Sequence, residues 1–199
     1  MELVSGAKRL ESGEIFIKGK KARITSPNAA IRHGIELIPE DRKEQGVILH
    51  NTVMFNTSLS CMKKLTKLGF ISGRKNRETA EKYRSDLSIK VPGIKQMVVN
   101  LSGGNQQKVV LAKALAADPE IIIFDEPTKG IDVGAKQEIY QLMNTLAEAG
   151  KAIIMISSDM EEIMGMSDRI VVLHEGTVAG ELHRDEFSQE RVLQLASGM

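Results

Sequence analysis

The chain has 199 residues, 42% of them hydrophobic, and its 27 basic and 26 acidic residues give a net charge of +1. This length and composition predict one globular domain, and the near-neutral charge argues against nucleic acid as a partner. The single Cys61 excludes an internal disulfide, and with only four scattered histidines the sequence offers no metal-ligand spacing of the structural zinc type. No apolar run approaches the roughly 20 residues of a membrane-spanning helix.

The first predicted elements are a hairpin and a short helix. Residues Glu14 to Lys18 and Lys21 to Thr25 alternate weakly on either side of Gly19, a pattern typical of a hairpin. Pro27 suits the first turn of a helix, which we expect to run to His33.

A strand, a charged loop and a helical subdomain are expected next. Ile35 to Ile38 is predicted as a short strand, and the segment EDRKEQG, Glu40 to Gly46, as an exposed loop because of its charge. Residues 52–100 are predicted to form a helical subdomain, with its clearest helical pattern at Arg74 to Leu87. Pro92 and Gly93 end the run of helices.

After residue 100 the pattern alternates between strands and helices. We expect an apolar helix after Leu101, strand Ile121 to Phe124, helix Val133 to Ala149, strand Ala152 to Ser157, a short helix from Asp159, and strands Arg169 to Leu173 and Thr177 to Glu181. Strands separated by helices of this length predict an α/β fold with a parallel sheet covered by helices.

The segment LSGGNQQK, Leu101 to Lys108, carries the first chemical signal. Ser102, Gly103 and Gly104 at a helix start present a hydroxyl and unobstructed backbone N–H groups, and the helix dipole adds partial positive charge, so an anion such as phosphate fits there. The triplet alone is more often an ordinary helix cap with a flexible turn. The complete segment, followed by an apolar helix, favours phosphate binding because it resembles the signature motif of ATP-binding cassette proteins.

The segment IIIFDEP carries the second signal. Asp125 and Glu126 leave the carboxyl end of an apolar strand, where open α/β sheets place their ligands. One of these carboxylates could face Mg²⁺, directly or through water, and the other could orient and deprotonate an attacking water. An apolar strand followed by two acids is by itself a weak pattern, so this interpretation depends on the segment that precedes it.

Together these segments resemble an ATP-binding cassette (ABC) ATPase. LSGGNQQK is similar to the signature motif and IIIFDEP to the Walker B strand with its catalytic glutamate. With EDRKEQG, TKGIDVGAK (Thr128 to Lys136) and ISSDMEEIMGMSDRI (Ile156 to Ile170), they resemble the second cassette of tandem-cassette ATPases that drive bacterial import of ribose, galactose, xylose and related sugars. The resemblance covers nearly the whole chain and implies one partial nucleotide-binding domain, residues 1–199, with a P-loop NTPase-like sheet, the helical subdomain and a small N-terminal antiparallel β part.

The resemblance also implies a site, cofactors and partners. It makes ATP and Mg²⁺ the cofactors, Glu126 the catalytic residue and Asp125 the metal ligand, and it implies nucleotide-binding roles for Ser102, Gly103, Gly104, Gln106, Asp132, Ser158 and Glu40. The implied partners are a first cassette, transmembrane permease subunits and, indirectly, a periplasmic or extracellular sugar-binding protein, with no nucleic acid. The chain would then lie at the cytoplasmic face of the membrane, held there by the permease.

Three departures from the family pattern alter this expectation. The 199 residues contain no G-x-x-x-x-G-K-[ST] phosphate loop (Walker A), and we expect that loop to stand just before Met1 in an N-terminally truncated cassette. Ser158 stands where many cassettes have a histidine, and Glu40 replaces a glutamine. We therefore expect the isolated chain to be inactive and its signature to complete an ATP site held by another cassette.

Two alternatives stay open at this stage. The chain could be an inactive truncated cassette, or a regulatory partner without its own ATPase activity. A non-transport ABC protein acting on ribosomes or DNA is less favoured, because the charge is near neutral and aromatic residues make up only 4%. The sequence reveals neither the sugar nor the oligomeric state.

Overall fold

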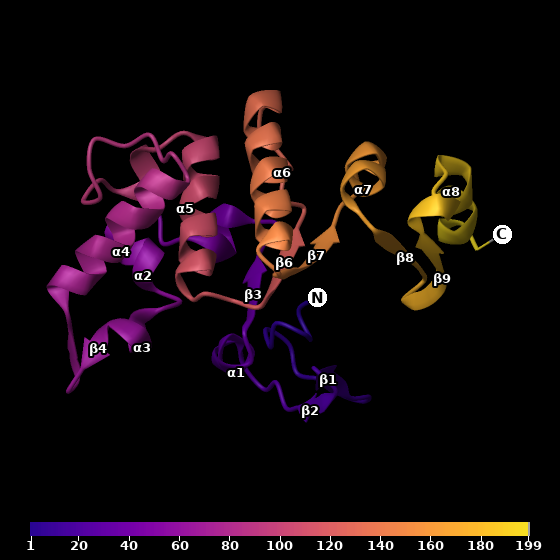
Figure 1. Ribbon diagram of the computed structural model, residues 1–199, viewed down its shortest axis with the longest axis horizontal. Coiled ribbons are helices and arrows are strands. Elements are labelled where there is room, and N and C mark those ends of the chain that lie inside the picture. The colour runs from indigo at the N-terminus through magenta and orange to yellow at the C-terminus, as the bar shows by residue number, and fades with distance from the viewer. Residues whose placement is uncertain (199) are drawn as a thin grey trace. The chain divides into compact units, whose positions relative to one another are not determined.

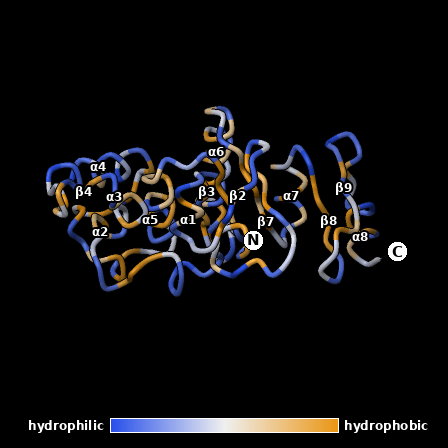
Figure 2. Tube along the Cα trace, turned by 90° about the horizontal axis from the view of Figure 1, so that it is seen from below, coloured by the Kyte–Doolittle hydropathy of each residue, from blue (hydrophilic) through white to orange (hydrophobic). Residues whose placement is uncertain are grey.

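The computed structural model describes residues 1–198, and the chain divides into two compact units after Ile154 (Figure 1). Hydrophobic colouring is clear along strands such as β8 (Arg169–His174), and hydrophilic colouring is clear at many of the connections between elements (Figure 2). None of the described helices is long and apolar enough to cross a membrane. That the 199 residues form a single domain stays a prediction.

The core of the first unit is a three-stranded sheet in the order β3 (Ile35–Ile38), β6 (Ile121–Asp125), β7 (Ala152–Ile156). Strands β3 and β6 run parallel, with Ile35 opposite Ile121. The three side chains from Ile122 to Phe124 are fully buried, as expected for a strand covered on both faces. The predicted α/β fold with a parallel sheet is confirmed.

Helices α1 (Pro27–Arg32), α5 (Gly103–Ala116) and α6 (Val133–Glu148) accompany this sheet, and α1 and α5 both contact β3. The Ser26 hydroxyl accepts from the backbone N–H of Ala29, and Pro27 occupies the first turn of α1 as predicted. Gly34 has a φ of 75°, which lets the chain turn from α1 into β3.

The helical segment contains α2 (Val53–Ser58), α3 (Met62–Leu65), α4 (Gly73–Asp86) and a 3₁₀ turn, η2 (Val98–Asn100). Helix α2 packs against α4 and α5. Cys61 is 3% exposed and packs with Leu65, Ala116 and Tyr83, and burial raises the pKa of its thiol. The Tyr83 hydroxyl donates to the carbonyl of Leu115 at 2.7 Å, which ties α4 to α5.

Two hairpins belong to the first unit. The predicted N-terminal hairpin is present as β1 (Ile15–Ile17) and β2 (Lys20–Ala22). A second one, β4 (Thr66–Lys67) with β5 (Phe70–Ile71), interrupts the segment that was predicted to be helical. Both turn through two residues with positive φ, Lys18 and Gly19 in the first and Leu68 and Gly69 in the second. Such turns match the twist of the flanking strands.

The charged segment after β3 differs from its prediction as an exposed loop. Residues Arg42–Gly46 form a five-residue π-helical turn, η1, capped by the Asp41 carboxylate, which accepts from the N–H groups of Lys43 and Glu44. Gly46 is buried, and an added Cβ there would lie 2.8 Å from a methyl group of Val110 on α5. The segment is therefore mostly exposed, as predicted, but it is a helical turn with one buried glycine instead of an irregular loop.

The second unit contains α7 (Met160–Met166), β8 (Arg169–His174), β9 (Thr177–His183), a 3₁₀ turn, η3 (Arg184–Glu186), and α8 (Gln189–Ala196). Strands β8 and β9 were predicted as strands, but they pair with each other in an antiparallel hairpin instead of extending a parallel sheet. Helix α8, which the sequence pattern did not predict, packs on them around a core of Ile170, Val172, Leu182 and Val192.

Candidate functional site

The head of α5 holds the residues of the predicted phosphate site. Ser102 is the N-cap, and Gly103 and Gly104 form the start of the first turn. The backbone N–H groups at a helix start have no partner within the helix and carry partial positive charge. A Cβ added at Gly104 would meet only the methyl group of Ala135, at 3.8 Å. The backbone is therefore open for close approach by an anion.

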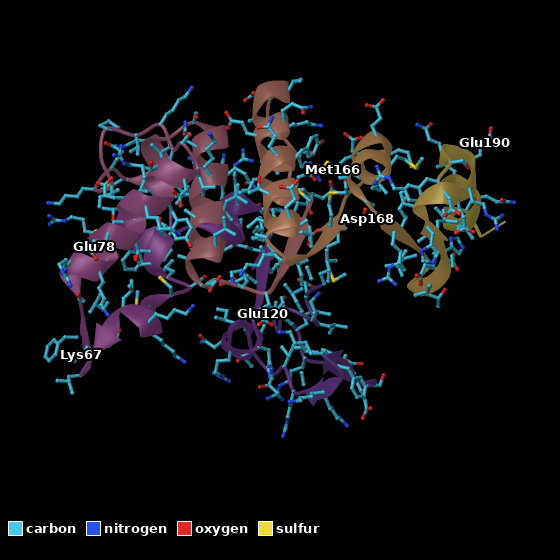
Figure 3. All side chains as sticks on the ribbon, in the orientation of Figure 1. Lys67, Glu78, Glu120, Met166, Asp168 and Glu190 are labelled. Atoms are coloured by element: carbon cyan, nitrogen blue, oxygen red, sulfur yellow. The ribbon has the colours of Figure 1, made fainter. Side chains whose placement is uncertain are left out.

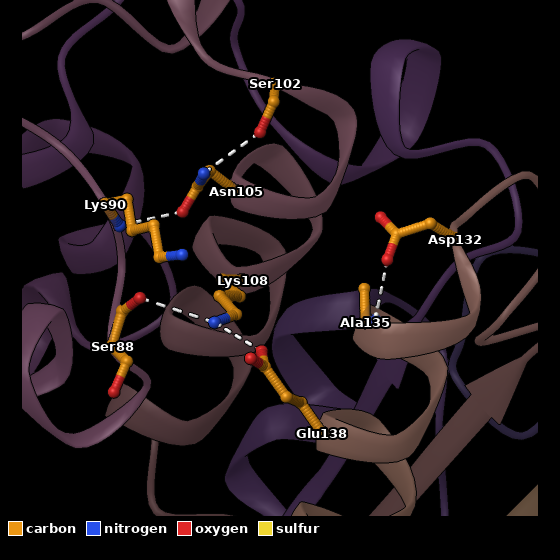
Figure 4. Close-up of polar contacts among 8 residues, drawn as sticks. All are labelled: Ser88, Lys90, Ser102, Asn105, Lys108, Asp132, Ala135 and Glu138. Atoms are coloured by element: carbon orange, nitrogen blue, oxygen red, sulfur yellow. Dashed lines mark hydrogen bonds and ion pairs between the residues drawn. The ribbon is translucent and has the colours of Figure 1, made fainter.

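The Ser102 hydroxyl is held in place from inside its own helix (Figure 4). It makes no capping bond to the α5 backbone, and instead accepts from the side-chain amide of Asn105 at 2.9 Å. The Asn105 amide oxygen accepts from the backbone N–H of Lys90 at 2.8 Å, so the helical segment is linked to the signature. Sequence reasoning missed Asn105, although it lies within the LSGGNQQK motif.

Two glutamines attach the head of α5 to its surroundings. The predicted nucleotide-binding residue Gln106 is 6% exposed, and its amide donates to the carbonyls of Val98 and Leu101, both at 3.2 Å. In this structure Gln106 holds the segment before the helix through these two hydrogen bonds. Its contact with nucleotide stays a prediction. Gln107 donates to the carbonyl of Pro127 at 3.4 Å, which links α5 to the segment after β6.

Arg42 of η1 reaches the signature, which the sequence did not indicate. A Cβ added at Gly103 would lie 3.0 Å from the Nη2 atom of Arg42, so the guanidinium group lies against this glycine. The Nε atom of Arg42 is buried without a hydrogen-bond partner. Arg42 therefore places a fixed positive charge beside the helix start. Nothing in the run EDRKEQG distinguishes Arg42 from Lys43, so only the fold could reveal this role.

A buried pair of opposite charges lies behind η1. Burial raises the pKa of Glu36 on β3, and burial lowers the pKa of Lys113 on α5, while the attraction between the two groups opposes both shifts. The Lys113 ammonium group donates to the carbonyl of Gly46, and Oε1 of Glu36 has no hydrogen-bond partner. The body of α5 is therefore joined to both β3 and η1.

The carboxyl end of β6 holds the two predicted acids. Burial raises the pKa of Asp125, and the nearby negative charges of Glu40 and Glu126 raise it further. Glu126 has a φ of 47°, so the chain turns sharply as soon as the strand ends. The described residues contain no cluster of three or more metal-ligating side chains. One or two carboxylates nevertheless fit Mg²⁺, which takes its remaining ligands from water and phosphate oxygens.

Glu40 lies close to this end of the sheet but is engaged elsewhere. Its carboxylate forms an ion pair with the ammonium group of Lys129 at 2.6 Å, and this contact raises the pKa of Lys129. Lys129 itself follows the turn that begins at Glu126, whose carbonyl accepts from the Lys129 N–H. The structure therefore places Glu40 near Asp125, and the sequence did not indicate the lysine that pairs with Glu40.

The remaining predicted residues have local structural contacts. Asp132 caps α6, its carboxylate accepting from the N–H of Ala135 at 3.0 Å (Figure 4). Ser158 belongs to the second unit, beside Ser157, whose hydroxyl donates to the carboxylate of the buried Glu162. The nucleotide-binding roles of Asp132 and Ser158 stay predictions.

A hollow in the first unit lies away from these residues. It measures about 820 Å³ and is lined mainly by α1 and by the residues around α3, including Ile31, His33 and Met62. Neither the signature residues nor the two carboxylates of β6 line it. It is therefore separate from the site that the motifs define.

Most of the first unit matches the model of a known protein family. Residues 1–129, which include both the signature helix and the β6 carboxylates, match the family model described as "ABC transporter". The chain belongs to the ABC transporter family. The resemblance inferred from the motifs is thus confirmed at the level of the family.

Curated relatives of this ABC-family chain include three import proteins. A putative ribose/galactose/methyl galactoside import ATP-binding protein of Halalkalibacterium halodurans is 48% identical over the whole chain and 38% of its own length. The xylose import ATP-binding protein XylG of Thermoanaerobacter pseudethanolicus is 50% identical over 94% of the chain and 37% of its own. The ribose import ATP-binding protein RbsA of Bacillus subtilis is 46% identical over the whole chain and 40% of its own. The chain spans about two fifths of these relatives.

Solved structures agree on the fold. A dimeric ATP-binding cassette described in a post-hydrolysis state bound to ADP and Pi matches with a TM-score of 0.77 at 25% identity, over 94% of this chain and 79% of its own. A second ATP-binding cassette, described in its ADP conformation, matches with a TM-score of 0.75 at 20% identity, over the whole chain and 82% of its own. This ABC-family chain therefore has the fold of nucleotide-binding cassettes.

Proposed function

We propose that the chain is part of the ATP-binding subunit of a bacterial ABC importer for ribose, galactose, xylose or a related monosaccharide. The three import proteins described above support this, because each is 46–50% identical to nearly the whole chain. They are also more than twice as long as the chain, which leaves room for another cassette. The importer would couple ATP binding and hydrolysis to sugar uptake.

Within this importer the chain contributes its signature to an ATP site that another cassette completes. The observation that carries this proposal is the open head of α5, where Gly103 and Gly104 leave the backbone accessible and Asn105 orients the Ser102 hydroxyl. The 199 residues contain no phosphate loop with which they could hold the triphosphate themselves. An N–H-lined helix start with Arg42 beside it would stabilise negative charge on a terminal phosphate.

The β6 end has a different role in this proposal. Asp125 is the ligand for Mg²⁺, and Glu126 orients water at a second nucleotide position. Mg²⁺, when bound, would neutralise phosphate charge there. Because Glu40 is paired with Lys129 and Ser158 replaces a histidine, we expect this second position to hydrolyse ATP weakly, so that the signature is the chain's main contribution.

The proposed partners are a first cassette, permease subunits and, through the permease, a sugar-binding protein outside the membrane. The permease would contact η1 and the helical segment, with the chain held peripherally at the cytoplasmic face. The hollow between α1 and α3 supports such a contact, because a segment of a partner could enter a depression of about 820 Å³.

The test is stimulation of hydrolysis in the partner cassette. A first cassette with an intact phosphate loop, ATP and Mg²⁺ are mixed with increasing amounts of the chain, and phosphate release is measured. We expect Ser102→Arg to reduce the stimulated rate by about 10²-fold or more, because a bulky cation fills the phosphate position. Ser85→Arg, at an exposed serine of α4, is the matched control and should leave the rate unchanged.

Two results would contradict the proposal. Equal stimulation by Ser102→Arg and the unaltered chain would show that the signature does not close over the nucleotide. A lack of stimulation by the unaltered chain at saturating concentration would favour an inactive or regulatory cassette. Glu126→Gln should change the stimulated rate by no more than about twofold, because the hydrolysing position lies in the partner. A loss of about 10²-fold would show that ATP is hydrolysed at the β6 carboxylates of this chain instead.

A further inference from the structure

The near-neutral charge of the whole chain conceals one strongly basic segment. Positions 62 to 77 contain six basic residues and no acidic residue: Lys63, Lys64, Lys67, Arg74, Lys75 and Arg77. Because the chain as a whole carries only +1, the rest of it carries a net −5. The segment comprises α3, the β4–β5 hairpin and the first turns of α4, and all six basic residues are exposed.

The tip of the β4–β5 hairpin is apolar as well as exposed. Leu68 is 90% exposed, Phe70 80% and Ile71 46%. Leu68 occupies the turn with a φ of 52°, an uncommon conformation for a leucine, and Lys67 lies opposite Phe70 in the ladder. Figure 3 shows Lys67 at this end of the helical segment. Apolar groups surrounded by cations form an amphipathic surface.

Most of the basic side chains around this tip form no ion pair with a carboxylate of residues 1–198. Among the described residues, no carboxylate forms an ion pair with Lys63, Lys67, Lys75 or Arg77. Arg74 forms one long ion pair of 3.6 Å with Glu78. The Lys64 ammonium group donates to the carbonyl of Ala117. The β1–β2 hairpin has the same kind of turn and an exposed Phe16, but Lys18 pairs with Glu120 at 2.7 Å and Lys21 pairs with Glu14. In the part of the chain that the structure describes, the β4–β5 hairpin and its flanks therefore keep more unpaired positive charge around exposed apolar side chains than the β1–β2 hairpin, where two of the three lysines are paired.

We propose that the β4–β5 hairpin, with the start of α4, binds the surface of an anionic phospholipid membrane. Lys and Arg beside such a surface are attracted by the headgroup charge, and Leu68 and Phe70 would insert at the boundary between headgroups and acyl chains. A protruding apolar tip suits a fluid interface, whereas a nucleic acid would gain nothing from Leu68. The contact is separate from nucleotide chemistry, since it uses none of the residues of the signature or of β6.

The first test uses the absence of tryptophan from the chain. Phe70→Trp introduces a single fluorophore at the tip, and Phe16→Trp, on the β1–β2 hairpin, is the matched control because Phe16 is 59% exposed. The full 199-residue chain is mixed with vesicles of phosphatidylcholine containing about 30% phosphatidylglycerol. We expect a blue shift of emission for Phe70→Trp and none for Phe16→Trp, and no shift for either with pure phosphatidylcholine.

The second test measures vesicle co-sedimentation. Lys67→Glu combined with Lys75→Glu should lower the partition coefficient more than tenfold, because each charge near the surface contributes about fivefold. Leu68→Ser combined with Phe70→Ser should also lower it about tenfold, by removing the apolar contact. Both pairs are exposed, so circular dichroism should show an unchanged fold, and Phe16→Ser should keep the parental partition.

Each remaining outcome overturns the proposal. Equal binding to neutral vesicles would make charge irrelevant, and equal loss in Phe16→Ser would remove the specificity for this hairpin. Binding only to vesicles that contain the reconstituted permease would assign the surface to a protein partner. An absence of binding by the parent chain to anionic vesicles would refute it directly. None of these results bears on the hydrolysis test, so the two proposals can fail separately.

Discussion

The head and the body of α5 differ in burial, although they belong to one helix. In the body, Val109, Val110 and Leu111 are at most 2% exposed, and they pack in the core beside β3. At the head, Ser102 is exposed and Gly103 has only the side chain of Arg42 near it. The body therefore stabilises the fold while the head stays accessible, so we expect stability and function to respond to substitutions in different parts of this helix.

The largest expected effect is on the body. Leu111→Ala removes a buried side chain and leaves a cavity, so we expect the free energy of unfolding to fall by about 2–5 kcal/mol. Urea unfolding followed by circular dichroism measures it. Leu193→Ala, at a leucine of α8 that is 58% exposed, is the control and should change stability by about 0.5 kcal/mol or less. If Leu111→Ala lowered the free energy of unfolding by less than about 1 kcal/mol, the body of α5 would not have the stabilising role that we assign to it.

An intermediate effect is expected at the head. Asn105→Ala removes the bonds to Ser102 and to the N–H of Lys90, so we expect a loss of about 1 kcal/mol in stability and roughly tenfold in the hydrolysis that the chain stimulates. Asn105→Asp keeps an acceptor for Lys90 but cannot donate to Ser102. It should therefore recover stability and not hydrolysis. Recovery of both would show that the orientation of Ser102 has no function.

The smallest effect concerns pH and the buried carboxyl group beside the body. Burial raises the pKa of Glu36 above the value that the group has in the unfolded chain. Between these two pKa values the folded state binds more protons, so the free energy of unfolding falls as pH rises through this window, which begins near 4.5. In Glu36→Gln, the free energy of unfolding should lack this part of its dependence on pH.

Unfolding in urea at a series of pH values measures that slope. The informative quantity is the difference between the unaltered chain and Glu36→Gln, because other carboxyl groups affect both proteins equally. Identical slopes would show that Glu36 titrates as it does in the unfolded chain. The attraction between Glu36 and Lys113, with the hydrogen bonds of Glu36, would then offset the full cost of burying this carboxylate.

The sequence predicted the elements whose pattern is strong and local. The strand of β6 and the helix α5 follow from uninterrupted apolar runs, and Asp125 and Glu126 lie where a strand end places them. Their position could be predicted because strand, turn and acids are contiguous, whereas their roles as metal ligand and catalytic residue stay predictions. The predicted hairpin β1–β2 followed in the same way from alternation around Gly19.

The sequence failed where contacts between distant segments decide the structure. The π-helical turn η1 depends on Gly46 packing against Val110, and the contact of Arg42 with Gly103 joins residues 61 positions apart. The β4–β5 hairpin was hidden because its strands have only two residues each, too few for alternation to be visible. Lys129 pairs with Glu40 across 89 positions, a distance that no local pattern conveys.

The burial of the single thiol has a practical consequence. Because Cys61 is 3% exposed and its pKa is raised, it should react slowly with maleimides at neutral pH. A spin label or dye could therefore be attached selectively to a cysteine introduced at a chosen exposed site, such as Lys67→Cys or Ser85→Cys. Distance measurements between such probes could then follow this chain within an assembled transporter, without first removing its natural cysteine.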